Sequence, residues 1–145
     1  MGVIAISFDL IYSPKECTEC RACMLRCSFE KEREYNLKLA RLTIKGKWPD
    51  EPKLTICRQC AKAKCVEACK TGALTQRDGI IKMDESLCIR CWACIDACPF
   101  DAIHEFRDKI IKCDTCDGTY PCTTVCSTSA LTIRQRGERQ DVRML

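Results

Sequence analysis

The chain has 145 residues, a formal net charge of +4 and 16 cysteines. A chain of this length forms one domain or two small ones. Cysteine at this density is typical of a protein held together by metal or disulfide bonds, and it argues against a large enzyme fold with a deep substrate pocket.

Short secondary-structure elements are predicted along the chain. Apolar and β-branched runs predict strands at 4–11, 41–44, 54–56, 79–83, 109–112 and 130–133. Residues 46–52 contain a glycine and two prolines and predict a loop. Residues 134–145 are charged and lack periodicity, which predicts a tail that is either disordered or laid on a partner.

The sequence carries no export signal that we recognise. Residues 1–14 lack a positively charged start, and Asp9 interrupts their apolar stretch. The longest charge-free run, 118–133, is too short and too polar to span a bilayer. We therefore expect a cytoplasmic protein without direct membrane insertion, whose thiols bind metal in a reducing environment. Export together with a partner that carries its own signal stays open.

All the cysteines fall into four groups of four. The groups are Cys17, Cys20, Cys23 and Cys27; Cys57, Cys60, Cys65 and Cys69; Cys88, Cys91, Cys94 and Cys98; and Cys113, Cys116, Cys122 and Cys126. The first and third have the spacing C-x2-C-x2-C-x3-C, while the middle gap widens to four residues in the second and to five in the fourth. Short helical turns are predicted across the third and fourth cysteines of each group.

The segments that follow three of the groups also repeat. After Cys69, Cys98 and Cys126 the fourth residue is alanine and the fifth is aliphatic. Such self-similarity indicates a repeated structural unit. His104 takes a place where the other copies have threonine, so we expect a residue on a strand face rather than a ligand. The first group departs from the pattern, because the charged stretch after Cys27 favours a longer helix.

The cysteine spacing suits a [4Fe-4S] cubane, whose four iron corners each need one thiolate. Three cysteines two residues apart can surround one face of the cluster, and the fourth must come from farther away. In the bacterial ferredoxin run C-x2-C-x2-C-x3-C-P the fourth cysteine ligates the other cluster of a pair, and Cys98-Pro99 completes that run here. The cysteines therefore predict four [4Fe-4S] clusters.

Zinc sites and disulfides could use the same residues. Zinc ribbons close with two C-x2-C pairs and give no reason for the extra cysteine of each group. A disulfide framework requires export. Both account for the spacing less well than iron–sulfur clusters do. No acid–base pair, nucleophile with its base or phosphate loop is recognisable, so we expect no catalytic residue.

The chain resembles the four-cluster iron–sulfur subunits of dimethyl-sulfoxide-reductase-type oxidoreductases and of hydrogenases, carbon monoxide dehydrogenases and tungsten aldehyde oxidoreductases. The resemblance covers roughly 11–133. The aldehyde oxidoreductase and carbon monoxide dehydrogenase type is favoured by the segments Cys27-Ser-Phe-Glu-Lys-Glu, Tyr35-Asn36, Ala40-Arg41-Leu42 and Cys57-Arg58-Gln59-Cys60.

This resemblance implies an α+β fold of two bacterial-ferredoxin-like units of the βαββαβ type, one inserted in the other. The outer unit would comprise 1–47 and 105–145, and the inner unit 48–104. The implied ligand sets are Cys17, Cys20, Cys23 and Cys126; Cys27, Cys113, Cys116 and Cys122; Cys57, Cys60, Cys65 and Cys98; and Cys69, Cys88, Cys91 and Cys94.

The cofactor changes the charge balance. An oxidised cluster with its four thiolates carries −2, so four clusters would bring the formal net charge from +4 to −4. With that charge and no basic stripe, we expect no nucleic-acid binding. Basic residues beside the cysteines either compensate the cluster charge or form a solvated face; they are Arg21, Arg26, Arg58, Lys62, Lys64, Lys70 and Arg90. Trp92 is expected to shield a cluster, and Trp48 to cover a cluster or a subunit contact.

The predicted function is electron transfer by a subunit that is not an enzyme on its own. It would relay single electrons between a catalytic subunit, in a hetero-oligomer, and a second redox partner or further copies of itself. The catalytic subunit would be of the tungsten or molybdenum aldehyde oxidoreductase or carbon monoxide dehydrogenase type. The alternatives are a freely diffusing polyferredoxin and, less favoured, a structural zinc module.

Overall fold

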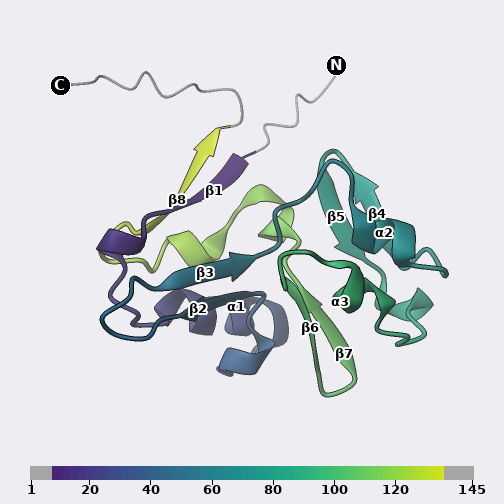
Figure 1. Ribbon diagram of the computed structural model, residues 1–145, viewed down its shortest axis with the longest axis horizontal. Helices are drawn as coiled ribbons and strands as arrows, with labels where there is room; N and C mark the ends of the chain where they lie inside the picture. Colours follow the sequence, from purple (N-terminus) through teal and green to yellow (C-terminus); the bar gives the residue numbers. More distant parts are fainter. Residues whose placement is uncertain (1–7, 136–145) are drawn as a thin grey trace.

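The computed structural model describes residues 8–135, which form four two-stranded antiparallel sheets and three α-helices (Figure 1). The strand pairs are β1 (Phe8–Tyr12) with β8 (Leu131–Gln135), β2 (Leu42–Lys45) with β3 (Lys53–Ile56), β4 (Leu74–Arg77) with β5 (Ile80–Met83), and β6 (Ile103–Phe106) with β7 (Lys109–Lys112). The helices are α1 (Ala22–Glu32), α2 (Lys64–Ala68) and α3 (Ala93–Ala97). The expected α+β class is confirmed.

The helices lie where the cysteine groups predict helical turns. The third cysteine of each of the first three groups lies inside a helix, and Cys69 and Cys98 directly follow α2 and α3. The fourth group has two short 3-10 helices instead, Thr115–Gly118 and Pro121–Thr123. No helix within 8–135 is long and apolar enough to cross a membrane.

The helix α1 is the longest, as the charged stretch after Cys27 predicts. It continues for 11 residues and ends where Arg33 turns into the left-handed region. Ser28, fully buried, then accepts a hydrogen bond from the backbone N–H of Asn36 at 3.1 Å, which folds the following segment onto the helix. The Phe29 and Tyr35 rings stack at 4.7 Å between centroids and hold the same bend.

The predicted strands agree with the structure in most places. Strands β2, β3, β5, β7 and β8 overlap the predictions, and 46–52 is the loop between β2 and β3. The prediction at 4–11 overlaps β1, but its first part lies outside the described residues. Residues 134 and 135 belong to β8 rather than to a tail, and the rest of the predicted tail lies outside the described residues.

Strands β4 and β6 were not predicted, and a tight turn explains why each forms. Each is joined to the next strand by two residues with positive φ, Asp78–Gly79 and Arg107–Asp108. This is the backbone pattern of a type I′ hairpin, whose twist matches that of paired strands. Strand β4, three of whose four residues are polar and exposed, and β6, which alternates less regularly, can therefore pair here, because the turn holds each against its partner strand.

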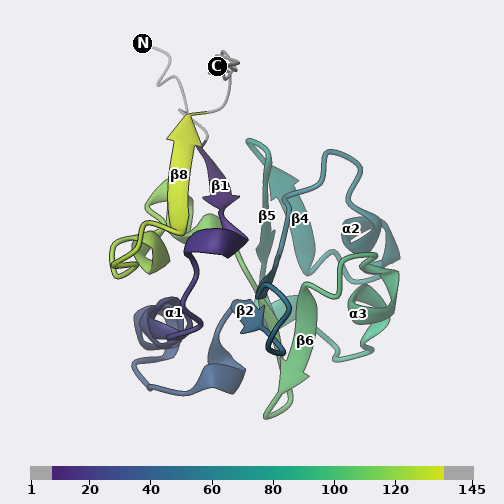
Figure 2. The same ribbon diagram turned by 60° about the vertical axis from the view of Figure 1, so that its left-hand side comes forward.

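Two separate clusters of buried side chains form the core. The first contains Met24, Cys27, Ala40, Leu42, Ile44, Cys122 and Leu131, and the second contains Ala63, Cys65, Leu74, Ile81, Ile103 and Ile110. In the turned view the elements around the first cluster lie on one side, while α2 and α3 pack together on the other (Figure 2). Strand β3 pairs with β2 and strand β7 with β6; the expected unit boundaries after residues 47 and 104 stay a prediction.

Candidate metal centre

Each cysteine group contains a left-handed residue at the same place. The second residue after the first cysteine has a φ of 55° at Glu19, 48° at Gln59, 58° at Arg90 and 62° at Thr115. Residues other than glycine rarely adopt positive φ, and such strain persists where the surrounding structure requires it, often at a ligand site. The recurrence indicates that the four loops share one backbone conformation at this position and serve the same kind of site.

The repeated tails also have one backbone conformation. The third residue after the fourth cysteine is left-handed in every copy: Gly72, Asp101 and Ser129. The alanine that follows it is buried in each copy, and the next, aliphatic residue is buried as well and begins β4, β6 or β8. The sequence repeat is therefore a turn that leads the chain from a cysteine into the core.

Three hollows in the structure are each lined by four cysteines from two different groups. Set 1 consists of Cys17, Cys20, Cys23 and Cys126, set 2 of Cys27, Cys113, Cys116 and Cys122, and set 4 of Cys69, Cys88, Cys91 and Cys94. These are the same combinations that the family resemblance implies; their binding of iron stays a prediction.

The remaining cysteines, Cys57, Cys60, Cys65 and Cys98, form set 3 of the prediction. Burial raises the pKa of the Cys65 thiol, and Cys57 and Cys98 lie close enough to raise it further by charge repulsion. The Arg58 guanidinium also lies 4.3 Å from the centre of the Phe100 ring. The loop of the second group therefore lies beside the end of the third.

Electrostatic interactions between thiols link the four sets in the order 1, 2, 3 and 4. Burial raises the pKa of Cys122 in set 2, and negative charge on Cys23 of set 1 raises it further. Burial likewise raises the pKa of Cys113 in set 2 to about 12, and Cys57 of set 3 acts in the same direction. Neighbouring sets are thus close enough to interact electrostatically.

An electrostatic interaction of the same kind links sets 3 and 4. The burial of the cysteines differs between the end sets and the inner sets. Burial raises the pKa of Cys94 in set 4 to about 11, and Cys65 of set 3 adds to the shift. Cys20 of set 1 and Cys91 of set 4 are exposed to solvent. The buried thiols belong to sets 2 and 3: Cys27, Cys65, Cys113 and Cys122. The row therefore opens to solvent at its two ends.

Hydrogen-bond donors surround the sulfur atoms. The backbone N–H of Arg41 donates to Cys27 Sγ at 3.2 Å, and that of Thr115 to Cys113 Sγ at 3.3 Å. Burial acts to raise the pKa of Cys69, but backbone N–H groups that begin with Leu74 outweigh it and lower the pKa. Such donors stabilise negative sulfur, so four thiols with N–H donors around each hollow fit an iron–sulfur cluster.

Sets 1 and 4 each have a threonine hydroxyl near the sulfur of a fourth-position cysteine. Thr71 Oγ1 lies 3.8 Å from Cys69 Sγ in set 4, and Thr128 Oγ1 lies 3.8 Å from Cys126 Sγ in set 1. The corresponding position after Cys98 of set 3 is Phe100. The second residue after the fourth cysteine therefore has the same place in the repeat but a different side chain in different sets.

The predicted basic residues mostly form a solvated face. Arg26, half-buried, pairs with Glu30 at 3.0 Å; the others are exposed, namely Arg21, Arg58, Lys62, Lys64, Lys70 and Arg90. Trp92 lines the hollow of set 4, whereas Trp48 is 90% exposed. His104 is half-buried on β6, with Nε2 2.9 Å from the Lys38 carbonyl oxygen.

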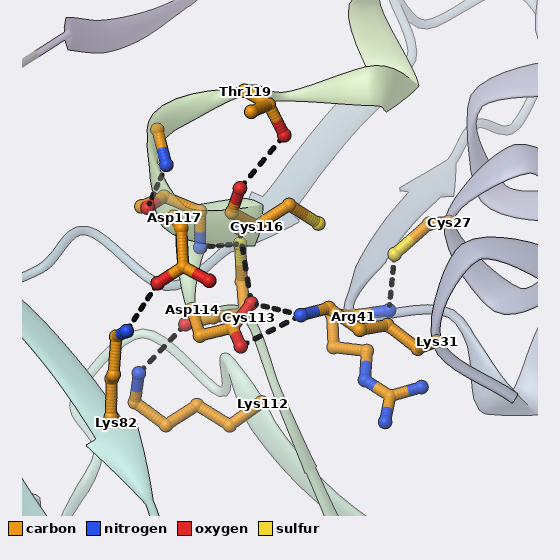
Figure 3. A network of polar contacts seen from close by, with 12 residues as sticks. Cys27, Lys31, Arg41, Lys82, Lys112, Cys113, Asp114, Cys116, Asp117 and Thr119 are labelled. Atoms are coloured by element: carbon orange, nitrogen blue, oxygen red, sulfur yellow. Dashed lines mark hydrogen bonds and ion pairs between the residues drawn. The ribbon is translucent and has the colours of Figure 1, made fainter.

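Two cations that approach the cysteines closely are absent from the sequence prediction (Figure 3). Lys31 of α1 bonds Asp114 Oδ2 at 2.7 Å and ties the helix to the loop of the fourth group. Lys112 is buried and donates to two backbone carbonyls. Lys112 directly precedes Cys113, so position beside a cysteine was a usable signal for it, whereas nothing local marks Lys31.

Within residues 8–135, no three histidine, cysteine, aspartate or glutamate side chains lie close enough together to hold a single metal ion. The thiols of sets 1, 2 and 4 instead each surround a hollow. A cubane needs that arrangement, because each thiolate binds a different iron corner.

Comparison with known proteins places the fold and the cysteines in one class. A model of the 4Fe-4S binding domain matches residues 81–104, which contain the third cysteine group. The structure resembles a chain of the active site complex BamBC of benzoyl coenzyme A reductase, with a TM-score of 0.55 and 21% identity over 95% of this chain and 83% of that one. This likeness shows the shared fold. Together the matches define an iron–sulfur protein of the ferredoxin type.

Curated relatives define the family. The chain is 31% identical to the polyferredoxin-like subunit of the aliphatic sulfonate oxidoreductase of Pyrococcus furiosus, over 81% of this chain and 70% of that protein. It is 30% identical to one of the chains of the polysulfide reductase of Wolinella succinogenes, over 89% of this chain and 76% of that one. The protein therefore belongs to the ferredoxin-type iron–sulfur electron-transfer subunits of oxidoreductases.

Another relative is much longer. Subunit beta of the NADH-dependent phenylglyoxylate dehydrogenase of Aromatoleum evansii is 34% identical over 84% of this chain, but the match spans only 29% of that protein. This chain therefore spans less than a third of the length of that relative.

Proposed function

We propose that the chain holds four [4Fe-4S] clusters and relays single electrons between a catalytic oxidoreductase subunit and a second redox partner. The observation that supports this most directly is the row of four cysteine sets, with an exposed cysteine at each end, Cys20 and Cys91. A relay needs accessible ends, and the buried cysteines, three in set 2 and one in set 3, all belong to the sets between those ends.

Each set would hold one cluster, and the clusters would supply the one-electron redox chemistry. The ligands would be Cys17, Cys20, Cys23 and Cys126 in set 1; Cys27, Cys113, Cys116 and Cys122 in set 2; Cys57, Cys60, Cys65 and Cys98 in set 3; and Cys69, Cys88, Cys91 and Cys94 in set 4. Because each set draws on two groups far apart in the sequence, folding and cluster binding would be coupled.

The polypeptide would contribute position, burial and hydrogen bonds. A compact chain of this length has a radius of gyration of roughly 15 Å, so four sets in a row are near neighbours. Side chains such as Met24 and Ile81 exclude water around them. Backbone donors such as the N–H of Arg41 stabilise negative charge on sulfur.

The finer parts of the proposal concern architecture and setting. The two groups of buried apolar side chains would be the cores of two ferredoxin-like units, one inserted in the other. The named relatives are subunits of oxidoreductases for a sulfonate, a polysulfide and phenylglyoxylate, which supports a catalytic partner for this chain too. That partner would be of the tungsten or molybdenum aldehyde oxidoreductase or carbon monoxide dehydrogenase type, in the reducing environment of the cytoplasm.

Anaerobic purification of the tagged chain from its own cells tests this function. Four cubanes require about 16 iron atoms and about 16 acid-labile sulfides per chain. A large subunit that stays bound through size-exclusion chromatography supports the proposed role. A fully loaded chain that elutes alone supports the diffusible polyferredoxin instead, and a colourless zinc protein would refute both.

A further inference from the structure

Lys112 is the one charged side chain among the buried residues of the described chain, with 7% of its surface exposed. Its Nζ donates to the carbonyl oxygen of Ile81 at 2.8 Å and to that of Cys113 at 2.7 Å; Figure 3 shows Lys112 beside Cys113. Within residues 8–135 no carboxylate lies within ion-pair distance of it. A buried cation without a counter-ion is costly, so its retention calls for a negative group nearby.

Lys112 lies where the two groups of buried apolar side chains meet. It ends β7, whose Ile110 belongs to the second cluster, and it immediately precedes Cys113 of set 2. Its Nζ donates to the carbonyl oxygen of Cys113, a residue of set 2, and to that of Ile81, which packs in the same group of buried side chains as Cys65 of set 3. One ammonium group therefore lies at the boundary of the two inner sets.

A neutral side chain already joins the same backbone segments. Gln59, 8% exposed, donates from Nε2 to the Cys113 carbonyl oxygen at 2.9 Å, and its Oε1 accepts from the Ile81 N–H at 2.7 Å. The junction of β5 with the fourth cysteine group therefore has hydrogen bonds that need no charge. The charge of Lys112 calls for a separate explanation.

We propose that Lys112 is an internal counter-charge that makes the clusters of sets 2 and 3 easier to reduce. The proposal rests on the function proposed above. Sets 2 and 3 contain the buried thiols, where water cannot stabilise an added electron, and burial alone would make the middle of the row the hardest part to reduce. A fixed cation between them favours the more negative, reduced state. Lys112 thereby lowers the barrier that burial would place in the relay.

The test is an anaerobic redox titration of the cluster-loaded chain, followed by the electron paramagnetic resonance of the reduced clusters. Lys112→Met removes the charge and keeps most of the side-chain volume. We expect two of the four couples to become harder to reduce by about tenfold or more, which is 59 mV for a one-electron couple, while the other two stay close to the wild-type values.

Three matched variants separate charge from structure. Gln59→Met breaks the neutral contacts to the same two residues, and Lys53→Met removes one exposed lysine from β3; neither is expected to shift two couples as Lys112→Met does. Lys112→Arg keeps the charge and is expected to stay near wild type. If Lys112→Met does not load its clusters, Lys112→Gln, which can still donate a hydrogen bond, is titrated in its place.

The outcomes distinguish this inference from the function on which it rests. Unchanged potentials in a fully loaded neutral variant would overturn the role of Lys112 and leave the relay intact. An equal shift of all four couples, or the same shift in Gln59→Met, would also overturn it. Too little iron and sulfide in the wild-type chain would instead refute the proposed function.

Discussion

Glu32 at the end of α1 connects segments that belong to the two groups of buried apolar side chains. Its removal is therefore expected to destabilise the whole chain. Its carboxylate pairs with Arg41, whose backbone bonds Cys27, and accepts from Lys109 Nζ of β7 at 2.9 Å. The Glu32 side chain is 18% exposed. Exposed ion pairs contribute about 0–1 kcal/mol, and removing one partner of a buried pair costs about 3–5 kcal/mol. For this half-buried position, Glu32→Gln should cost about 1–2 kcal/mol.

The assay is the rate at which the loaded protein loses its visible absorbance in guanidinium under anaerobic conditions, because cluster loss makes unfolding irreversible. A cost of about 1–2 kcal/mol sets an upper limit of roughly 5- to 30-fold on the faster loss, reached when the Glu32 contacts are already broken in the unfolding transition state. The matched control is Glu34→Gln, since Glu34 also pairs with an arginine, Arg107, but is 43% exposed. We expect that control to remain close to wild type.

The pH dependence follows from the direction of the Glu32 pKa shift. Burial acts to raise this pKa, but hydrogen bonds and charge from Arg41 and Lys109 outweigh it and lower the pKa below the ordinary 4.5. A carboxylate with a lowered pKa stabilises the fold above its ordinary pKa, and the contribution is lost as the pH falls through the folded-state value. The rate of absorbance loss of Glu32→Gln, divided by that of the wild type, should therefore be constant between about pH 6 and 8. Equal rates for Glu32→Gln and Glu34→Gln, or a ratio that changes in that window, would refute this reasoning.

Three further predictions concern other contacts. Thr128→Val removes the hydroxyl 3.8 Å from Cys126 Sγ, so redox titration should find one couple at a lower potential; an unchanged set of potentials would contradict this. Gly79→Ala places a side chain at a φ of 75° and should destabilise the β4–β5 hairpin by about 1 kcal/mol, seen as faster absorbance loss. Ile81→Ala empties a site that is 1% exposed and should cost about 2–5 kcal/mol in the same assay, whereas Ile89→Ala, 65% exposed, should change the rate little.

The cysteine spacing was enough to predict the class of protein. The spacing of thiols along a short loop is a local property, so four groups of four cysteines, two of them with the ferredoxin spacing, predicted a 4Fe-4S protein and an electron-transfer subunit before any fold was known. The number of clusters and the type of catalytic partner stay predictions. The turns after Cys69, Cys98 and Cys126 were visible as a repeat, because each depends on a left-handed residue and on a buried alanine and aliphatic residue next to it in sequence.

Pairings between distant segments were less accessible. Strands β4 and β6 have little apolar periodicity of their own and form because tight turns pair them with β5 and β7. The order of the four sets follows from electrostatic interactions such as that of Cys113 with Cys57, which are far apart in the chain. The family resemblance could suggest the combinations of cysteines, but no local pattern contains them.

Local covalent spacing thus determines which chemistry the chain can hold, because ligands in one loop are constrained by the backbone that links them. Tertiary packing decides which groups face one another, which thiols lose contact with water, and where Lys112 places its charge. Burial and electrostatic interaction depend on everything within several ångströms in space, and the neighbours of Lys112 come from β5, β7 and two cysteine groups. Its position beside Cys113 could be seen in the sequence; its place between two buried sets could not.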